Sequence, residues 1–359
     1  MAKRKSFPPI EYAVSVLPGL EEVAGDEIQA RLRGARIIKR QRGWVVLGYP
    51  GKPDDLFALR TVEDVFVVLF HTGKLPSFRK GALPLLARMA RGSRYWDQAL
   101  GLFYRLNRRV RRVTFRVIAQ MTGKLGFRRQ EARDAVLGGV QERWGRRWKA
   151  VADDAHIELW VPIINQWALI AIRLSDRTMR HRTYKEAHRP ASLRPTLAAA
   201  MVFLSDPAPK DRFCDPMCGA GTILAERARH GSSDMLLGGD MDGEALHAAA
   251  ANLSGTVGCT LYEWDAARLP LQANSLDVVV SNLPFGEKIG SHEQNQVLYD
   301  RFFKQLLRVL CPGGRAVLLT AEKELMRRML QAYPQFVCKQ QVLVGVLGKA
   351  ARIYILHRR

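Results

Sequence analysis

The chain has 359 residues, of which 47% are apolar and 25% charged, a composition typical of globular proteins large enough for more than one domain. Lysine and arginine outnumber aspartate and glutamate by 56 to 34, so the formal net charge is +22. No apolar stretch approaches the length of a membrane span, and none follows the basic N-terminus as a signal sequence would, so we expect no membrane association. The five cysteines are scattered without zinc-binding spacing, which favours a reducing, cytoplasmic location and no metal centre.

The N-terminal residues alternate strand and helix patterns. Glu11–Val16 predicts a strand, and the apolar residues of Leu20–Leu32 recur at helical spacing. Trp44–Leu47 and Val65–Phe70 predict two further strands. This order predicts a small α+β domain over residues 1–72.

A second domain is expected over residues 73–175. Val113–Ile118 predicts a strand and Arg129–Arg143 a helix. Ile157–Pro162 and Ala168–Arg173 predict two strands joined by a tight polar turn. The sequence therefore predicts a second α+β domain.

Half of the net charge lies in this second domain. Residues 101–150 hold 14 lysines and arginines against three acids, a net charge of +11. A polyanionic partner accounts for such an excess, because cations that neutralise phosphates release counterions. We expect Lys124, Arg128 and Arg129, in a glycine-bearing loop before a helix, to contact phosphates. Taken singly, each is equally well explained as a solvated position on a helix surface.

A basic linker is expected over residues 176–194. Arg177–Arg194 is poor in aliphatic residues and holds six basic side chains against one acid. We assign Arg180, Arg182 and Lys185 to phosphate binding as well.

The last domain, residues 195–359, alternates strands and helices as a doubly wound, mostly parallel sheet does. Its first motif is a strand that ends at Asp215 and is followed by a glycine-bearing turn and a helix from Thr222. The turn is shorter than a dinucleotide-binding loop, and Asp215 would repel a pyrophosphate but suits the ammonium group of methionine. We predict that this motif binds the methionine part of a cofactor through Asp215, Pro216, Cys218, Gly219, Gly221 and Thr222.

Two further acids follow at strand ends. Asp240 lies 25 residues after Asp215, about one strand–helix unit, where a carboxylate binds the hydroxyls of a ribose. Asp242 is an alternative ribose ligand, but we assign it to the N-cap of the next helix. Met241 and Ala266 are expected to contact the cofactor, and Asp265, after the third strand, can accept a hydrogen bond from its adenine amino group.

The fourth motif carries the chemistry. Leu276–Ser281 predicts a buried strand, and Asn282, Leu283, Pro284 and Phe285 follow it. This N-L-P-F tetrapeptide differs by one residue from the N-P-P-[YFW] motif of amino-methyltransferases. The oxygens of Asn282 and Leu283 are placed to accept the two N–H bonds of an exocyclic amine, Pro284 makes the turn rigid, and Phe285 offers a face for an extruded base. Together the motifs predict an S-adenosyl-L-methionine-dependent methyltransferase.

These segments resemble the THUMP-domain RNA guanine-N2 methyltransferases, in particular the TrmN-like enzymes that modify guanosine at position six of tRNA. The resemblance rests on DPMCGAGTILAE, GGDMD and NLPFGEKIG, on YAVSVLPGLEEVAGDEI near the N-terminus, and on RTYKEAHRPASLRPTLAAAMV before the last domain. It implies a ferredoxin-like unit over residues 1–72, a THUMP RNA-binding domain over 73–175 and a Rossmann-fold methyltransferase domain over 195–359. It adds Thr196 as a contact to the methionine end of the cofactor, and it places guanine against Asn282 and Phe285.

The resemblance implies N2-methylation of guanosine at position six of the acceptor stem, with structured RNA, foremost tRNA, as the partner and no obligate protein partner. Two alternatives remain open at this point. One is the same reaction on ribosomal RNA, because guanine methyltransferases of that class share these motifs. The other is an RNA-binding factor with a relic cofactor site, which predicts broken site residues, whereas Asp215, Asp240, Asp265 and Asn282 are all present.

Overall fold

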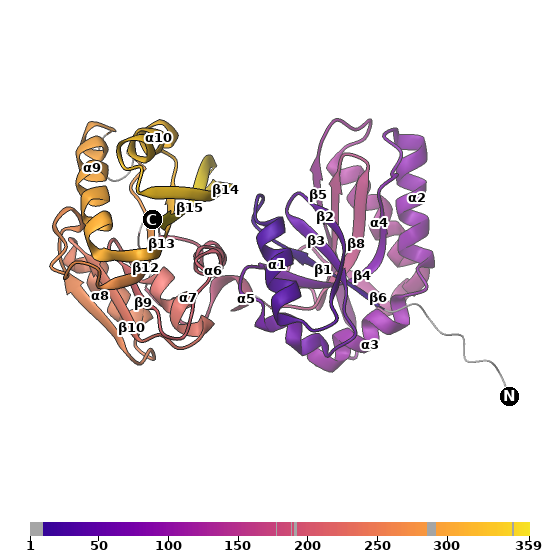
Figure 1. The fold of residues 1–359 in the computed structure, drawn as a ribbon. Helices are drawn as coiled ribbons and strands as arrows, with labels where there is room; N and C mark the ends of the chain where they lie inside the picture. Colours follow the sequence, from indigo (N-terminus) through magenta and orange to yellow (C-terminus); the bar gives the residue numbers. More distant parts are fainter. Residues whose placement is uncertain (1–9, 177, 188, 190–191, 286–291, 347) are drawn as a thin grey trace. The chain divides into compact units, whose positions relative to one another are not determined.

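The computed structural model divides into two compact units, each built around its own sheet (Figure 1). One unit comprises Met1–Val16 and Ile28–Met179, and the other comprises Leu17–Glu27 and Arg180–Arg359. The residues that the structure describes are 10–176, 178–187, 189, 192–285, 292–346 and 348–359.

Up to residue 173 the chain alternates strands with helices. In order, the elements are β1 (Glu11–Ser15), α1 (Glu21–Arg31), β2 (Arg36–Gln41), β3 (Trp44–Gly48), η1 (Pro53–Ala58), β4 (Asp64–Thr72), α2 (Arg79–Gly92), α3 (Trp96–Leu106), β5 (Val113–Thr122), α4 (Arg129–Trp144), η2 (Gly145–Arg147), β6 (Trp148–Ala150), β7 (Ile157–Ile164) and β8 (Trp167–Arg173).

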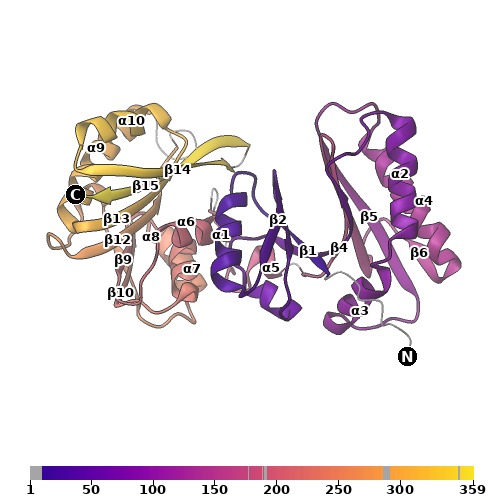
Figure 2. The ribbon, with the colours of Figure 1, turned by 45° about the vertical axis from the view of Figure 1, so that its right-hand side comes forward.

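These strands form one sheet in the order β2-β3-β1-β4-β8-β7-β5-β6, antiparallel except where β5 pairs with β6 and β7. Antiparallel pairing of β4 with β8 joins the strands expected in residues 1–72 to those expected in 73–175. All of these strands share one sheet, and a domain boundary at residue 72 remains a prediction from the sequence. Helices α2 and α4 lie side by side (Figure 2), and they approach closely at Gly139, where a Cβ would lie 2.2 Å from the carbonyl oxygen of Ala87.

The second unit follows the strand–helix alternation expected from the sequence. Its elements are α5 (Thr178–His181), α6 (Pro195–Leu204), β9 (Arg212–Asp215), α7 (Thr222–His230), β10 (Met235–Asp240), α8 (Gly243–Asn252), β11 (Cys259–Glu263), η3 (Ala266–Arg268), β12 (Leu276–Asn282), α9 (His292–Val309), β13 (Leu310–Thr320), α10 (Lys323–Ala332), β14 (Phe336–Val346) and β15 (Lys349–Arg358).

The sheet of this unit has the order β11-β10-β9-β12-β13-β15-β14. The five strands β9, β10, β11, β12 and β13 are parallel, and β15 pairs antiparallel with β13 and β14. The predicted mostly parallel, Rossmann-like sheet is thus confirmed. Side chains alternate along β12, with Val278 and Val280 in one core and Val279 in the other.

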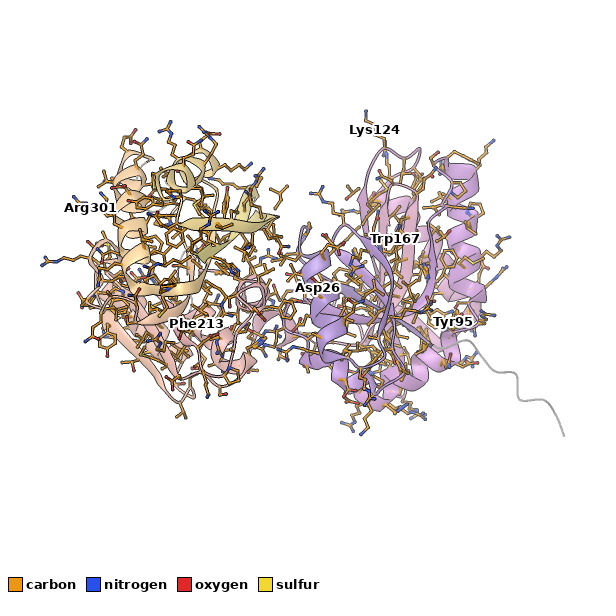
Figure 3. The ribbon with its side chains drawn as sticks, in the orientation of Figure 1. Asp26, Tyr95, Lys124, Trp167, Phe213 and Arg301 are labelled. Carbon is orange, nitrogen blue, oxygen red and sulfur yellow. The ribbon has the colours of Figure 1, made fainter. Side chains whose placement is uncertain are left out.

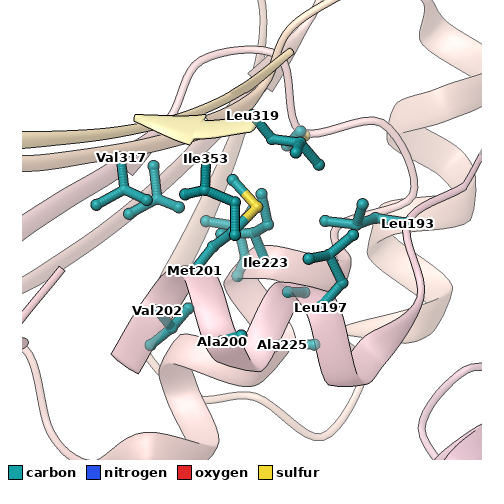
Figure 4. Packing of buried hydrophobic residues seen from close by; sticks show 14 of the residues in the cluster. Leu193, Leu197, Ala200, Met201, Val202, Ile223, Ala225, Val317, Leu319 and Ile353 are labelled. Atoms are coloured by element: carbon teal, nitrogen blue, oxygen red, sulfur yellow. The ribbon is translucent and has the colours of Figure 1, made fainter. Parts of the chain in front are cut away.

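Two buried clusters cover the two faces of this sheet. One lies beneath α6 and α7, where Met201, Ile223 and Ile353 converge (Figure 4). The other lies beneath α9 and α10 and contains Tyr299, Phe302 and Phe303. Both clusters reach strand β12, so the strand that precedes the N-L-P-F motif is packed from both sides and fixes where that motif begins.

Candidate active site

The predicted site residues meet at one edge of the parallel sheet. The chain goes from β9 outward to β10 and β11 on one side, whereas β12 pairs with the other side of β9. This change of direction is a topological switch point, where open α/β sheets bind ligands beyond the carboxyl ends of their strands. Asp215 ends β9, Asp240 ends β10 and Asn282 ends β12.

Asp215 is almost fully buried, with 1% of its surface exposed. Its Oδ1 accepts hydrogen bonds from the Ser281 hydroxyl at 2.9 Å and from the Met217 amide at 3.3 Å. Burial raises the pKa of Asp215 to about 7, helped by the nearby charge of Asp240 and opposed by the two hydrogen bonds. A carboxyl group in this state gains from a cationic partner, since an ammonium ion would stabilise its ionised form.

The glycine-bearing turn is held by backbone hydrogen bonds to β10. The Cys218 amide donates to the carbonyl of Gly239 at 2.9 Å, and the Gly219 amide donates to Asp240 Oδ2 at 2.8 Å. Gly219 and Gly221 have positive φ angles of 51° and 71°, which side chains other than glycine rarely adopt. The turn leads directly into α7, whose first residue, Thr222, is buried.

Asp240 joins two loops. While Oδ2 accepts from Gly219, Oδ1 accepts from the Asp242 amide at 3.1 Å. Asp242 caps α8, because its carboxylate accepts from the amides of Glu244 at 2.9 Å and Ala245 at 3.4 Å. The N-cap assignment of Asp242 is thus confirmed. Met241, between the two acids, is 75% exposed and lies free to cover a ligand.

The third strand brings Asp265 and Ala266 to the same edge. Asp265 is exposed and its carboxylate accepts from the Ala267 amide at 2.8 Å, while Ala266 is buried. No sequence pattern predicts a role for Trp264, which packs on Gly239 so tightly that a Cβ there would lie 2.0 Å from the indole. The indole nitrogen donates to the Pro216 carbonyl at 3.1 Å, so Trp264 supports the turn after β9.

Two polar side-chain atoms in the site are buried and lack a hydrogen-bond partner within the described residues. They are Asn282 Oδ1 at the end of β12 and Thr196 Oγ1 in the first turn of α6. Buried polar atoms nearly always have partners, and each one that does not requires an explanation. A bound ligand that donates a hydrogen bond to Asn282 and contacts Thr196 would explain both atoms.

The N-L-P-F loop is packed against both cores. Leu283 is 1% exposed in the cluster beneath α9, whereas Phe285 packs against the cluster beneath α6. The Leu283 amide donates to the Leu319 carbonyl of β13 at 2.9 Å. The resemblance also drew on Gly286–Gly290, which lie outside the described residues.

Lys124, Arg128 and Arg129 are exposed around the start of α4 (Lys124 is labelled in Figure 3). The Arg128 amide donates to Glu131, which also pairs with Arg79 at 3.0 Å. All three side chains are thus exposed on the first unit and accessible to a phosphate.

The other predicted phosphate contacts have mixed surroundings. Arg182 is buried, with its Nε 3.5 Å from Glu226, and Lys185 donates to the Leu193 carbonyl at 2.5 Å. Burial lowers the pKa of Lys185 to about 8, partly offset by the charge of Glu226. Both side chains thus stabilise the predicted linker on the second unit, whereas Arg180 is half-buried.

Within the described residues, no cluster of three or more histidine, cysteine, aspartate or glutamate side chains has the arrangement of a metal site. Over the same residues, no helix has the length and apolar character needed to cross a bilayer.

Comparison with known proteins relates the second unit to a methyltransferase family. Residues 182–350 match the family model described as the RMKL-like methyltransferase domain. The solved structure of TrmN from Thermus thermophilus superposes with a TM-score of 0.79 at 26% identity, covering 98% of this chain and 100% of that chain.

Curated relatives carry related names. The tRNA (guanine(6)-N(2))-methyltransferase THUMP3 of Mus musculus is 34% identical over 261 residues, which are 68% of this chain and 51% of that protein. This chain thus spans about half the length of that relative. The tRNA (guanine(6)-N2)-methyltransferase of Thermus thermophilus is 29% identical over 348 residues, which are 95% of this chain and 97% of that protein.

Proposed function

We propose that this chain, whose residues 182–350 match the RMKL-like methyltransferase domain, methylates the exocyclic N2 of guanosine in tRNA. The single observation that carries the proposal is the buried Oδ1 of Asn282 at the switch point of the sheet, which has no hydrogen-bond partner among the residues that the structure describes. An acceptor without a donor suits an amine that arrives with the substrate. The names of the relatives favour guanosine at position six of the acceptor stem.

The residues around β9 and β10 fit S-adenosyl-L-methionine, which supplies an already activated methyl group when bound. Asp215 is a buried acid placed to receive the ammonium group, and Asp240 is placed to receive the ribose hydroxyls. Met241, Asp265 and Ala266 would contact the ribose and adenine. The rest of the methionine site is assigned to Thr196, Pro216, Cys218, Gly219, Gly221 and Thr222.

The residues after β12 orient the amine. Asn282 Oδ1 and the Leu283 carbonyl accept hydrogen bonds from its two N–H groups, which turns the nitrogen lone pair toward the methyl donor and increases its sp³ character. Phe285 stacks on the extruded base. The site needs no strong general base, because the proton can pass to water once the nitrogen has become cationic, and catalysis rests on positioning and desolvation.

The first unit is assigned to RNA binding. We propose that residues 1–72 are a ferredoxin-like domain and that residues 73–175 are a THUMP domain. Lys124, Arg128 and Arg129 are its exposed phosphate contacts, joined by Arg180 near the start of the second unit. Such contacts orient the RNA without distinguishing its bases.

Transfer of labelled methyl groups from S-adenosyl-L-methionine to total tRNA and to ribosomal RNA tests the proposal. Nuclease digestion should release labelled N2-methylguanosine from tRNA, and a tRNA with adenosine at position six should stay unlabelled. Label found only in ribosomal RNA would identify ribosomal RNA, and not tRNA, as the substrate. Label in N6-methyladenosine would overturn the choice of base, and no label in either RNA would leave an RNA-binding factor.

The RNA surface needs a separate measurement. Replacing Lys124, Arg128 and Arg129 together by alanine should reduce the slope of log affinity against log salt by about one unit for each lost contact. Replacing Lys210, Arg301 and Lys304 of the second unit is the matched control. An equal loss in the control would remove the reason for assigning RNA binding to the first unit.

A further inference from the structure

Helix α9 holds the loop that follows Asn282. The Pro284 carbonyl accepts a hydrogen bond from Tyr299 Oη at 2.8 Å and another from Asn295 Nδ2 at 3.1 Å. Both donor side chains are 1% exposed, although both belong to a helix whose other side is solvated. Two buried donors on one carbonyl oxygen satisfy both of its lone pairs.

The donor and the acceptor of each hydrogen bond in this network can be assigned. Tyr299 has one hydroxyl proton and gives it to Pro284, so in its 2.7 Å hydrogen bond with Thr320 the threonine must be the donor. The Thr320 oxygen in turn accepts from the Glu322 amide at 2.9 Å. The chain of hydrogen bonds runs from Glu322 to Pro284 through the buried side chains of Thr320 and Tyr299, and consecutive hydrogen bonds of this kind strengthen one another.

This network fixes more than one carbonyl. The Leu283 amide is held by Leu319 of β13, and the Pro284 carbonyl is held by α9. The proline ring fixes the φ angle between these two anchors. The peptide that carries the Leu283 carbonyl lies between them, so its orientation follows from both anchors.

We propose that Tyr299 and Asn295, supported by Thr320, are positioning residues that orient the amine-accepting loop of the active site. The inference rests on the proposed function, since the Leu283 carbonyl and Asn282 are its proposed amine acceptors. Neither Tyr299 nor Asn295 needs to touch the cofactor or the base. Their effect should therefore appear in turnover and in loop rigidity, not in the affinity for S-adenosyl-L-methionine.

The variants are chosen to separate positioning from packing. Tyr299→Phe removes the hydroxyl and keeps the ring in the core. Thr320→Val removes the proton donated to Tyr299, whereas Thr320→Ser keeps it. Tyr333→Phe is the matched control, because Tyr333 lies in the same core and donates to Asp300 of the same helix at 2.8 Å without contact to Pro284.

The first measurement is steady-state and single-turnover kinetics with the full chain, tRNA and S-adenosyl-L-methionine. Tyr299→Phe should lower kcat about tenfold, because small misplacements of reacting groups are costly. KM for both substrates should remain near the wild-type value. Thr320→Val should lower kcat less, Thr320→Ser should restore it, and Tyr333→Phe should leave it unchanged. In an Asn282→Ala background the further loss from Tyr299→Phe should nearly vanish.

The second measurement does not depend on activity. Hydrogen exchange of the Leu283 amide should accelerate about fivefold in Tyr299→Phe, the loss expected for one hydrogen bond. Exchange in the β12 residues before Asn282 should stay unchanged, as should Leu283 exchange in Tyr333→Phe.

Equal kcat and equal Leu283 exchange in Tyr299→Phe and Tyr333→Phe would overturn the inference. If the wild-type chain methylates no RNA, the proposed function fails. The exchange experiment then still decides whether Tyr299 holds the loop. Faster Leu283 exchange in Tyr299→Phe together with a wild-type kcat would also reject the inference. It would show that Tyr299 holds the loop without orienting the proposed amine acceptors.

Discussion

The proposed cofactor side and the proposed substrate side of the candidate active site pair their buried polar atoms differently. On the cofactor side, Asp215 accepts from Ser281 and Met217, and Asp240 accepts from two backbone amides. On the substrate side, the oxygen of Asn282 is buried without a partner in the described chain. The acids therefore shape their loops before any ligand binds, whereas Asn282 keeps its capacity for the ligand. One half of the site should contribute to stability and the other half mainly to turnover.

The second unit contains another buried asparagine, Asn252, with which Asn282 can be compared. Asn252 is 2% exposed, and its side chain makes three hydrogen bonds: Oδ1 accepts from the Ala187 amide at 2.9 Å, while Nδ2 donates to the carbonyls of Ala187 at 3.0 Å and Ala220 at 2.9 Å. It ties the predicted linker to the turn after β9. Two buried asparagines thus differ chiefly in whether the protein itself satisfies them.

The largest effect is expected for Asn282→Ala. Single-turnover methylation should fall by about a hundredfold to a thousandfold, as when one donor or acceptor aimed at the reacting group is lost. The free energy of unfolding should change by less than about 0.5 kcal/mol, because no hydrogen bond within the described protein is removed. Kinetics and urea denaturation of the same preparation measure both quantities.

Asn252→Ala is the matched control. It leaves one buried and two partly buried backbone groups without their partner, so it should reduce the free energy of unfolding by about 3 kcal/mol. If Asn282→Ala destabilises the chain as much as Asn252→Ala does, then Asn282 has a structural partner and the distinction between the two sides of the site is lost.

Asp240→Asn should produce the next largest effect, on cofactor affinity. The change replaces one carboxylate oxygen by an amide nitrogen that cannot accept from Gly219 or Asp242, and it weakens the ribose contact. Calorimetry should give a Kd for S-adenosyl-L-methionine raised about thirtyfold, the loss of one hydrogen bond to a charged group. Glu263→Gln, at the paired position of β11, should bind normally. Wild-type affinity in Asp240→Asn would remove the ribose assignment.

Cofactor binding should also depend on pH through Asp215. Because burial raises the pKa of Asp215 to about 7, most of it is protonated at pH 6 and ionised at pH 8. Affinity for the ammonium group should therefore rise about tenfold over this range, with proton release detectable by calorimetry in buffers of different ionisation enthalpy. Asp215→Asn should bind weakly and without this dependence.

The stability of the ligand-free protein should change with pH in the opposite direction to the cofactor affinity. The folded state binds the proton of Asp215 more tightly than the unfolded state does, so the ligand-free protein should become less stable as the pH rises from about 4 to about 7. Denaturation of Asp215→Asn across this range should lack that component. A rise in stability over the same range, specific to the wild-type chain, would contradict the raised pKa of Asp215.

Local spacing explains what the sequence predicted well. The acids at strand ends, the glycine turn and the N-L-P-F motif each occupy a few consecutive residues, and parallel strands bring their carboxyl ends to one edge. The relatives confirm the family resemblance drawn from those motifs. Whether the named residues bind cofactor and base remains a prediction.

Contacts between distant residues explain what the sequence missed. Ser281 bonds to Asp215 across 66 positions, and Tyr299 bonds to a backbone oxygen, which no residue pattern encodes. The composition of the basic segment 176–194 predicts a linker. Its Tyr184 hydroxyl, however, donates to Glu226 at 2.6 Å, and such a buried partner cannot be recognised from the linker alone.

Residues 74–112 gave the weakest sequence signal, and two helices lie there. Helix α2 contains Pro84, which normally argues against a helix interior, and Gly81 in its first turn. Packing against α4 compensates for this low propensity, since Gly139 lets the two helices approach closely. Tertiary contact thus overrides local preference in this segment.

The smallest effect is expected for Asp242, the acid beside Asp240. Asp242→Ala removes the N-cap of α8 and should lower the free energy of unfolding by about 1 kcal/mol. Loss of its ion pair with Arg189 should add little, because both side chains are partly solvated. Asp242→Ser keeps a capping oxygen and should recover most of the stability. The Kd for S-adenosyl-L-methionine should stay at the wild-type value in both variants, because the ribose is assigned to Asp240 and Asp242 to the cap of α8. A Kd raised as far as in Asp240→Asn would identify Asp242 as the ribose ligand and assign Asp240 to loop structure alone.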